Sequence, residues 1–503
     1  MQKDLVIQIL RGYDALEVFN EDRCDIDKIA NLFKKTQDTK YVDILFELYN
    51  ISKDPYIVTT MKQILIEEYF AIDITIQIYT QICLAEFRDN IVKKFEYKNQ
   101  CYFYERILER LKKELQFEFP QDYRSDSNVI VMVTDMFRLL PTAHAPSQII
   151  HHLARLLEEH LGKEVYIVNA CILAQRDKVS PIWDIDYYTR QEHKLDGVFE
   201  VDINGYMYKG LQVNLDADML DNIKIALDYI IGKKPAIVLG MICFNSVVAE
   251  ICKEFTKFAA MTFFETMPIT TADYVITYFK QNSEYCQSVR RDLLSENKYI
   301  FDFKLYAWNI FKPTRKVNKD YLGFKAENFV IGIIGNRLKY DVSEQMLQEI
   351  DYIIANFSQV RIVTMGISDI DEKVLNKFSR IKEKLVYIGY ESDLQNNIQA
   401  IDLFVNPPTQ GGAGGALIAM KVGIPVITLG SGDVSDYVPD EFICKEIKDY
   451  STIIKRYIID RKYYESQAKL AKEYIKVEIE IPKEKTAADL ENIFNKIMIM
   501  ETI

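Results

Sequence analysis

Residues 402–430, DLFVNPPTQGGAGGALIAMKVGIPVITLG, decide the fold of this chain. Residues 402–408 begin as a short apolar strand, and residues 424–430 form a second one of the β-branched kind that is buried in parallel sheets. Residues 414–423, between the two, predict a helix. A strand, a helix and a strand in this order form the repeating unit of a doubly wound α/β domain.

The same alternation extends outward from this stretch. Toward the N-terminus, strands are expected at 327–336, 360–366 and 384–390, with helices between them. This regularity predicts a Rossmann-like domain over residues 325–480, and the tail 481–503 predicts a C-terminal helix.

Residues 125–320 have the same texture. NVIVMVTD at 128–135 predicts a buried strand, residues 148–162 an amphipathic helix and residues 164–170 the next strand. Further strands are expected at 197–203, 235–241, 259–264 and 274–279. We therefore expect another Rossmann-like domain here, and a cleft where the carboxyl ends of the two sets of strands face each other.

Residues 1–122 differ from the rest, because glycine is absent after Gly12 and proline occurs only at Pro55 and Pro120. Apolar residues recur at helical spacing, which predicts an all-helical domain. The predicted fold class is therefore α/β, with two doubly wound domains facing a cleft and preceded by an all-α domain. The helical domain could either bind a substrate or form homo-oligomer contacts.

The composition of the 503 residues, 49% hydrophobic and 27% charged, is typical of a soluble globular protein. A net charge of −12 argues against a broad phosphate-backbone footprint, so we expect no nucleic-acid partner. The apolar runs are too short for a transmembrane segment. Eight scattered cysteines without a CxxC pair, and an N-terminus without a secretory pattern, predict a cytoplasmic location.

The glycine-rich stretch is the strongest candidate for ligand binding. Four glycines within residues 411–415 let the backbone approach a ligand closely and expose N–H groups where a helix begins. Such groups make an anion site that suits a phosphate or diphosphate. Without a ligand, the same loop would be a tight connection between strand and helix. The candidate binding residues here are Asn406, Gly411, Gly412, Gly414 and Gly415.

A short basic segment follows the first strand of the 325–480 domain. It comprises Gly335, Asn336, Arg337 and, after a leucine, Lys339. Two cations at a strand end can neutralise a diphosphate, and arginine can do so with two parallel hydrogen bonds. The alternative is a solvated basic turn.

Single titratable residues lie at other strand ends. His144, in the loop PTAHAPS, can act as a base or bind a sugar near the reacting bond, or it can merely brace the loop. His151 and His152, in the next helix, are interpreted as packing residues. Glu265 and Asp433 can each hold a hydroxyl-rich ligand or cap the following helix, and capping is favoured for Asp433.

These segments, together with YIGY at 387–390 and AMKVGIPVIT at 419–428, resemble the nucleotide-sugar-binding half of GT-B glycosyltransferases. The resemblance covers residues 325–440 and is closest to the group that contains glycogen-synthase-like and sucrose-synthase-like enzymes, family 4 in type. It implies a donor diphosphate on the second α/β domain and an acceptor mostly on the first. It also implies that no metal ion and no cofactor is required.

Carried over residue by residue, the resemblance assigns Arg337 and Lys339 to the donor diphosphate. It assigns the 411–415 loop to a cradle of backbone N–H groups, and Gly389 and Tyr390 to the side of the base. One departure is Ile418, which occupies the position of the glutamate that holds the ribose in many relatives. Ribose binding would then depend on Asp433 or be weakened, and a retaining or inverting outcome stays open.

A helical region before a GT-B pair is similar in arrangement to bacterial cytoplasmic protein N-glycosyltransferases and to the O-GlcNAc transferase superfamily. This similarity implies a protein acceptor, with glycan or lipid extension as the alternative. The leading hypothesis is transfer of a hexose from a UDP-linked sugar. The alternatives are a catalytically silent GT-B relative that serves as a scaffold or partner subunit, and a sugar-nucleotide epimerase.

Overall fold

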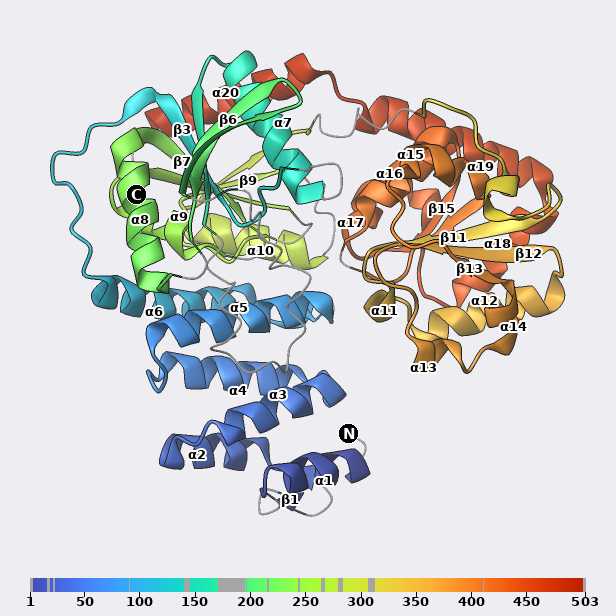
Figure 1. Ribbon diagram of the computed structural model, residues 1–503, viewed down its shortest axis with the longest axis horizontal. Coiled ribbons are helices and arrows are strands. Elements are labelled where there is room, and N and C mark those ends of the chain that lie inside the picture. Colours follow the sequence, from blue (N-terminus) through green and yellow to red (C-terminus); the bar gives the residue numbers. More distant parts are fainter. Residues whose placement is uncertain are drawn as a thin grey trace.

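The computed structural model describes residues 3–15, 19–20, 23–89, 91–139, 145–170, 195, 197–214, 217–242, 245–263, 267–278, 284–305, 313–409 and 411–500. Figure 1 shows three parts: a helical region, a first α/β part beside it and a second α/β part across from both. His144 and Glu265 lie outside the described residues. No helix in the described part of the chain is both long and apolar enough to cross a membrane.

The helical region is built from stacked helices whose apolar faces are buried against one another. Local signals set their starts: Asp54 accepts a hydrogen bond from the Tyr56 N–H, and Pro55 takes the first helical position. A two-residue antiparallel pair, β1 with β2, interrupts the helices, so the expectation of helix throughout was wrong there. The elements are α1 (Lys3–Gly12), β1 (Phe19–Asn20), β2 (Arg23–Cys24), α2 (Ile26–Thr36), α3 (Lys40–Ser52), α4 (Pro55–Ile66), α5 (Ile72–Arg88) and α6 (Tyr97–Leu115).

The first α/β part holds an eight-stranded sheet in the order β10-β9-β8-β7-β3-β4-β6-β5. All pairings are parallel except that of β5 with β6, which form a hairpin through Asn204 and Gly205, both with positive φ. The strands are β3 (Asp126–Thr134), β4 (Glu164–Asn169), β5 (Gly197–Ile203), β6 (Tyr206–Gln212), β7 (Pro235–Ile242), β8 (Lys257–Thr262), β9 (Tyr274–Thr277) and β10 (Tyr299–Asp302). The helices are α7 (Ala145–Glu159), α8 (Met219–Lys233), α9 (Val247–Ile251) and α10 (Glu284–Ser295).

The second α/β part holds six parallel strands in the order β13-β12-β11-β14-β15-β16. The strands are β11 (Phe329–Ile334), β12 (Val360–Met365), β13 (Leu385–Tyr387), β14 (Leu403–Val405), β15 (Val426–Leu429) and β16 (Ile443–Cys444). The helices are α11 (Leu338–Asp341), α12 (Glu344–Asn356), α13 (Glu372–Leu375), α14 (Ser379–Lys384), α15 (Leu394–Asn397), α16 (Ala413–Val422), α17 (Asp433–Asp436), α18 (Asp449–Ile459) and α19 (Arg461–Tyr474). The two sheets confirm the predicted α/β class with two doubly wound parts.

The C-terminal helix α20 (Lys483–Ile499) returns to the first α/β part (Figure 1). Lys257 of β8 donates to the carbonyl oxygens of Ile497, at 2.6 Å, and Met498, at 3.0 Å, and so caps the end of α20. Near its start, the Thr486 hydroxyl donates to the Lys304 carbonyl at 2.7 Å. These contacts hold α20, which follows the second α/β part in the chain, against the first α/β part.

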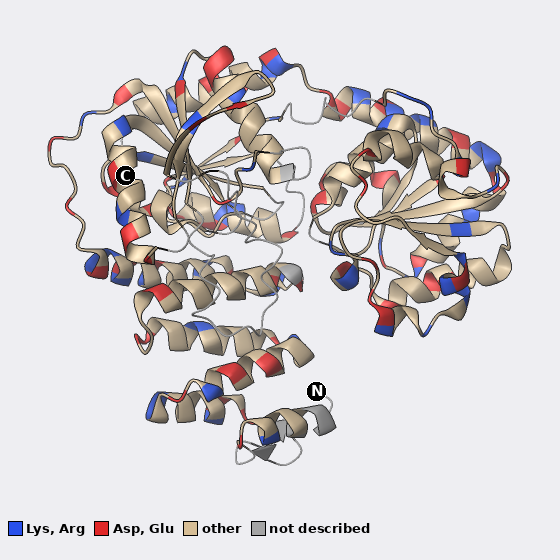
Figure 2. Ribbon diagram, viewed as in Figure 1, with Lys and Arg blue, Asp and Glu red and all other residues tan. Residues whose placement is uncertain are grey.

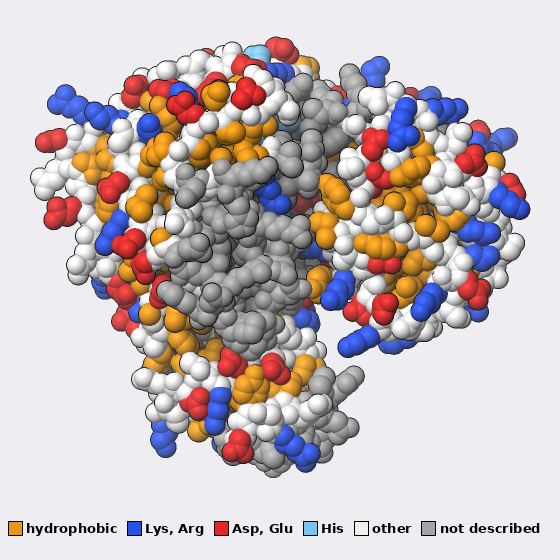
Figure 3. All heavy atoms as spheres, in the orientation of Figure 1, with side chains coloured by type: hydrophobic (Ala, Val, Ile, Leu, Met, Phe, Trp, Pro, Cys, Tyr) orange, Lys and Arg blue, Asp and Glu red, His pale blue; other side chains and the backbone are white. Residues whose placement is uncertain are grey.

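Charged side chains of both signs are distributed over all three parts (Figure 2). The face drawn in Figure 3 likewise shows basic and acidic side chains interspersed over the second α/β part. An anion site on this protein therefore depends on a local arrangement of a few groups.

Candidate donor-binding site

The strand order of the second sheet reverses between β11 and β14, which are paired side by side. In open α/β sheets, ligands bind outside the carboxyl ends of the strands at such a switch point. The segment 335–337 follows β11, and the segment 406–412 follows β14. The topology therefore brings the two predicted anion-binding segments to one place.

Arg337 joins these two segments directly. Its Nη2 donates to Thr409 Oγ1 at 2.7 Å, and the same nitrogen lies 3.4 Å from Asp341 Oδ1. The side chain is buried, and its guanidinium carbon lies 5.0 Å from the ring centroid of Phe87 in α5. Burial raises the pKa of Asp341, and the Arg337 charge beside it lowers that pKa in part. The alternative of a solvated basic turn does not hold for Arg337.

The glycine loop starts α16 and is tied to Arg337 through Thr409. The Gly411 N–H donates to Thr409 Oγ1 at 3.3 Å, and Gly412 precedes the helix with a φ of 102°, which favours glycine. The first N–H groups of an α-helix have no acceptor within the helix and carry its positive dipole end. Guanidinium and N–H groups thus converge on a place suited to an anion.

Asn406 lies under this loop and is buried. Its backbone carbonyl accepts from the Tyr450 hydroxyl at 2.9 Å, and its Nδ2 donates to Thr428 Oγ1 at 3.1 Å. Its Oδ1 has no partner among the described residues and faces Gly412, where a Cβ would lie 3.6 Å away. A half-turn of the amide exchanges oxygen and NH2, so either group can face Gly412.

Gly415 has a packing role in this arrangement. A Cβ there would lie 3.3 Å from the ring of Phe404, so the glycine lets α16 approach β14 closely. Gly414 stands beside it in the first turn of the same helix. The four glycines therefore divide between the loop, at Gly411 and Gly412, and the helix start.

Three glycines bring the neighbouring strand ends together. The Gly335 N–H donates to the Met365 carbonyl at 2.9 Å, and the Gly366 N–H donates to the Gly389 carbonyl, also at 2.9 Å. A Cβ on Gly366 would overlap the carbonyl oxygen of Gly335. Gly389 has a φ of 85°, and Tyr390 beside it is 46% exposed. The 389–390 segment, which the resemblance places beside the nucleotide base, therefore lies on the same edge of the sheet as the segment 335–337.

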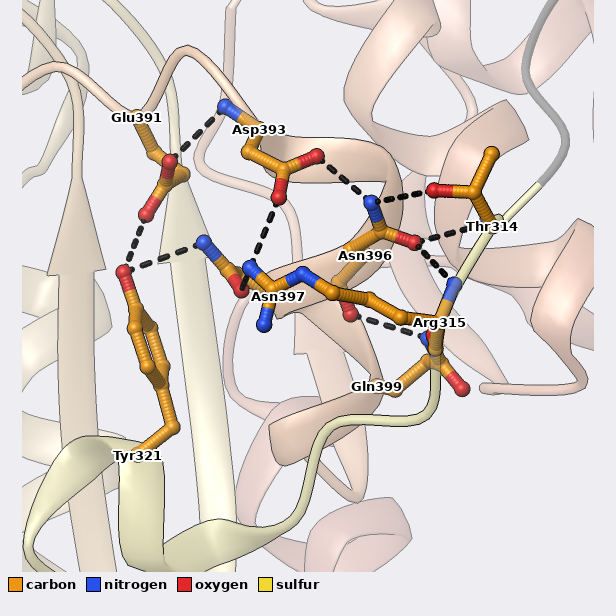
Figure 4. A network of polar contacts seen from close by, with 8 residues as sticks. All are labelled: Thr314, Arg315, Tyr321, Glu391, Asp393, Asn396, Asn397 and Gln399. Atoms are coloured by element: carbon orange, nitrogen blue, oxygen red, sulfur yellow. Dashed lines mark hydrogen bonds and ion pairs between the residues drawn. The ribbon is translucent and has the colours of Figure 1, made fainter.

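The residues that follow the 389–390 segment are held by a network of polar contacts (Figure 4). Glu391 accepts from the Tyr321 hydroxyl at 2.6 Å, and Arg315 reaches Asp393 at 2.7 Å and Asn397 Oδ1 at 2.9 Å. The other members of the network are Thr314, Asn396 and Gln399. Since Thr314, Arg315 and Tyr321 precede β11, the segment that enters this part of the fold fixes the loop after β13.

Lys339 and Asn336 occupy the outer side of the site. The Lys339 side chain is exposed, and its Nζ lies 5.6 Å from the Tyr340 ring centroid. The backbone N–H of Lys339 donates to Ser368 Oγ at 3.4 Å. The Ser368 hydroxyl in turn donates to the Asn336 carbonyl at 3.2 Å. The exposed Lys339 side chain would have to move to contact a ligand. The Arg337 side chain is already held by Thr409 and Asp341.

Asp433 and Ile418 are both buried. Gly432 takes the cap position of α17 with a φ of 85°, and Asp433 is the first residue inside the helix. The expectation that Asp433 caps the helix was therefore wrong, because its backbone is already helical. Ile418 lies within α16 and belongs to the apolar core.

On the first α/β part, His144 lies outside the described residues, and the base or brace role predicted for it stays a prediction. His151 is a packing residue, as predicted: its Nε2 lies 2.8 Å from the Arg138 carbonyl, its ring stacks on Phe137 at 4.8 Å, and burial lowers its pKa to about 4. At the end of β3, burial raises the pKa of Asp135 to about 7, and no local pattern had pointed to this residue.

Thr409, Asp341 and Phe87 were also missed from the sequence. Thr409 stands inside the glycine-rich stretch, and its hydroxyl beside a strand end was an available signal. Asp341 stands four residues after Arg337, a spacing that favours a pair on one helix turn. For Phe87 no local signal exists.

Comparison with known proteins supports the assignment of the fold. Residues 328–458 match the family described as Glycosyl transferases group 1. Sucrose-phosphate synthase from Thermosynechococcus elongatus has a similar structure, at 12% identity and a TM-score of 0.53, over 74% of this chain and 99% of that one. A mutant O-GlcNAc transferase from Thermobaculum terrenum is similar at 10% identity and a TM-score of 0.52, over 99% of this chain and 98% of that one. No curated protein matches the chain.

Proposed function

Starting from a GT-B fold that carries a glycosyltransferase group 1 domain, we propose that this protein transfers a hexose from a nucleotide diphosphate sugar, UDP-linked, to an acceptor. One observation carries the proposal. Arg337, Thr409 and the start of α16 converge at the switch point of the second sheet, in line with the 389–390 segment. A nucleoside diphosphate matches this order, with its diphosphate at Arg337 and the start of α16 and its base beside the 389–390 segment.

The chemistry follows from where charge develops. As the bond between the sugar C1 and the diphosphate oxygen breaks, negative charge grows on the leaving diphosphate. Arg337 and the N–H groups of the glycine loop neutralise it without reorganisation, because Arg337 is already fixed, and the mobile Lys339 side chain adds a second cation. The acceptor atom then bonds to C1 and passes its proton to a base, and His144 is the predicted base on the sugar face. Metal independence belongs to the proposal.

The acceptor proposed is a polypeptide, with a glycan as the alternative. Support comes from the arrangement of the chain: helical region and GT-B pair align together, over 99% of this chain, with a protein named as an O-GlcNAc transferase. At 10% identity this similarity concerns the fold, so the acceptor must be found by experiment.

A second candidate function is a catalytically silent partner subunit. It is favoured by Ile418, a buried apolar residue at the position where the resemblance implies a glutamate that holds the ribose. The buried Arg337, tied to the glycine loop, favours donor binding instead, because a scaffold has no need for a desolvated cation at a helix start.

The deciding experiment is calorimetric binding of UDP, GDP, ADP and TDP and their common sugars, with and without EDTA. The same samples are assayed for slow release of free sugar. We expect selective binding of one nucleotide, unaffected by EDTA, and acceptor-free hydrolysis of its sugar. No binding by folded protein would replace the proposal with the partner-subunit function, and conversion of the donor to an epimeric sugar would replace it with an epimerase.

A further inference from the structure

The last two turns of α5 in the helical region reach both α/β parts. Cys83 and Phe87 are one helical turn apart and share a face. Asn245 follows β7 in the first α/β part, and its Nδ2 donates to Cys83 Sγ at 3.9 Å. Phe87 meets Arg337 of the second α/β part at 5.0 Å. In Figure 1, α5 lies beside the first part and ends toward α11 of the second.

Phe87 covers Arg337 at the site where the donor is proposed to bind. Phe87 is 2% exposed and Arg337 is 9% exposed, so the ring and the guanidinium meet where little water can reach them. A cation over an aromatic face is attracted by the ring quadrupole, and the attraction grows when the cation is desolvated. Thr409 and Asp341 hold the edge of the same guanidinium. Ring and edge contacts together fix its orientation.

The end of α5 is itself held firmly by the helical region. Asp89, which follows the helix, accepts from the Tyr49 hydroxyl at 2.9 Å and pairs with Lys53 at 2.9 Å, both contributed by α3 and the residue after it. The Asp89 N–H donates to the Ala85 carbonyl at 2.9 Å. Phe87 is therefore placed by the fold of residues 3–115 and not by the loop it touches.

We infer that Phe87 is a positioning residue of the donor site: it orients and desolvates Arg337 for the diphosphate, so that the helical region forms part of that site. The inference rests on the proposed function. It changes the role of the helical region, which the sequence connects only with acceptor binding or oligomer contacts. Removing residues 1–122 would remove Phe87 as well, and donor binding would weaken even though every residue of the second α/β part remains.

The test uses the full chain and four variants: Phe87→Leu, Phe87→Tyr, Arg337→Met and the double variant Phe87→Leu/Arg337→Met. UDP and inorganic pyrophosphate are the probes, because pyrophosphate reports on the diphosphate site whatever the base. Tyr102→Leu is the matched control, since Tyr102 is a 52% exposed aromatic residue of the neighbouring α6. Thermal melting of each variant monitors folding.

We expect Phe87→Leu to raise the Kd of both probes roughly 3- to 30-fold. Phe87→Tyr, which keeps the aromatic face, should restore most of the affinity, and Tyr102→Leu should not change it. In the Arg337→Met background, Phe87→Leu should have no further effect. The inference is overturned if Phe87→Leu leaves binding unchanged, or if it causes the same loss of affinity in the wild-type and the Arg337→Met protein. If Phe87→Tyr does not fold, the effect of Phe87→Leu in these two proteins is sufficient to decide. A wild-type protein that binds neither probe refutes the proposed function instead.

Discussion

Replacing Arg337 by methionine tests the donor site most directly, because the side chain does two separable things. It offers charge-assisted hydrogen bonds to a diphosphate, each of which contributes about 1.5–3 kcal/mol. We therefore expect Arg337→Met to weaken donor binding about 10- to 150-fold. It also neutralises Asp341, whose side chain is only 8% exposed, so the variant leaves a buried carboxyl without its cation.

The second effect depends on pH, which allows the two to be separated. Burial already raises the pKa of Asp341, and loss of Arg337 should raise it further. A group with a raised folded-state pKa lowers stability as pH rises through that pKa, so Arg337→Met should be destabilised more at pH 8 than at pH 5. The double variant Arg337→Met/Asp341→Asn removes the buried charge and should recover most of the lost stability, while donor binding stays weak.

The assay combines donor calorimetry with thermal melting at pH 5 and pH 8. Arg361→Met is the matched control, because Arg361 lies near the amino end of β12, at the opposite edge of the same sheet, and donates to the Ser358 and Val360 carbonyls. The reasoning is refuted if the double variant binds donor within about threefold of wild type, since the lost affinity would then come from Asp341 and not from the missing cation.

Three further predictions concern single groups of the fold. Folding raises the pKa of Asp135 from 3.8 to about 7, so the stability linked to this group is complete below about pH 4 and is lost as pH rises through 7. Above pH 7, Asp135→Asn should therefore raise the melting temperature and increase the free energy of unfolding by at most about 4 kcal/mol. At pH 4 the substitution should change neither quantity. Gly366→Ala should displace Gly335 and abolish measurable donor binding, because its Cβ would overlap the Gly335 carbonyl. Lys62→Met should lower stability by about 3–5 kcal/mol, since it leaves Glu86, 2.7 Å away and 1% exposed, without its cation; thermal melting measures the loss.

Each of these predictions has a control. Gly232→Ala, in α8 with open space around its Cβ, should be neutral or slightly stabilising, and a similar loss in both glycine variants would contradict the overlap argument. Adding Glu86→Leu to Lys62→Met should recover stability, and no recovery would show that the loss came from packing. A melting difference for Asp135→Asn that does not vary with pH would contradict the raised pKa.

The sequence alone determined the α/β class, most strands and the two segments that carry the anion site. These features have local signals: β-branched runs predicted β11, β12 and β3, and the glycines marked the connection between β14 and α16. The resemblance to GT-B glycosyltransferases also assigned Arg337 and the 411–415 loop to the same diphosphate.

Only the tertiary structure decided which groups complete the site. The pairing of β11 with β14 brings Thr409 to Arg337, the close approach of the strand ends requires Gly366, and the stacking of the helical region delivers Phe87. The antiparallel hairpin of β5 and β6 likewise depends on pairing. Such contacts join residues far apart in the chain, and their free energy comes from burial and close packing. No local pattern of residues encodes them, because they exist only once the parts of the chain have folded against one another.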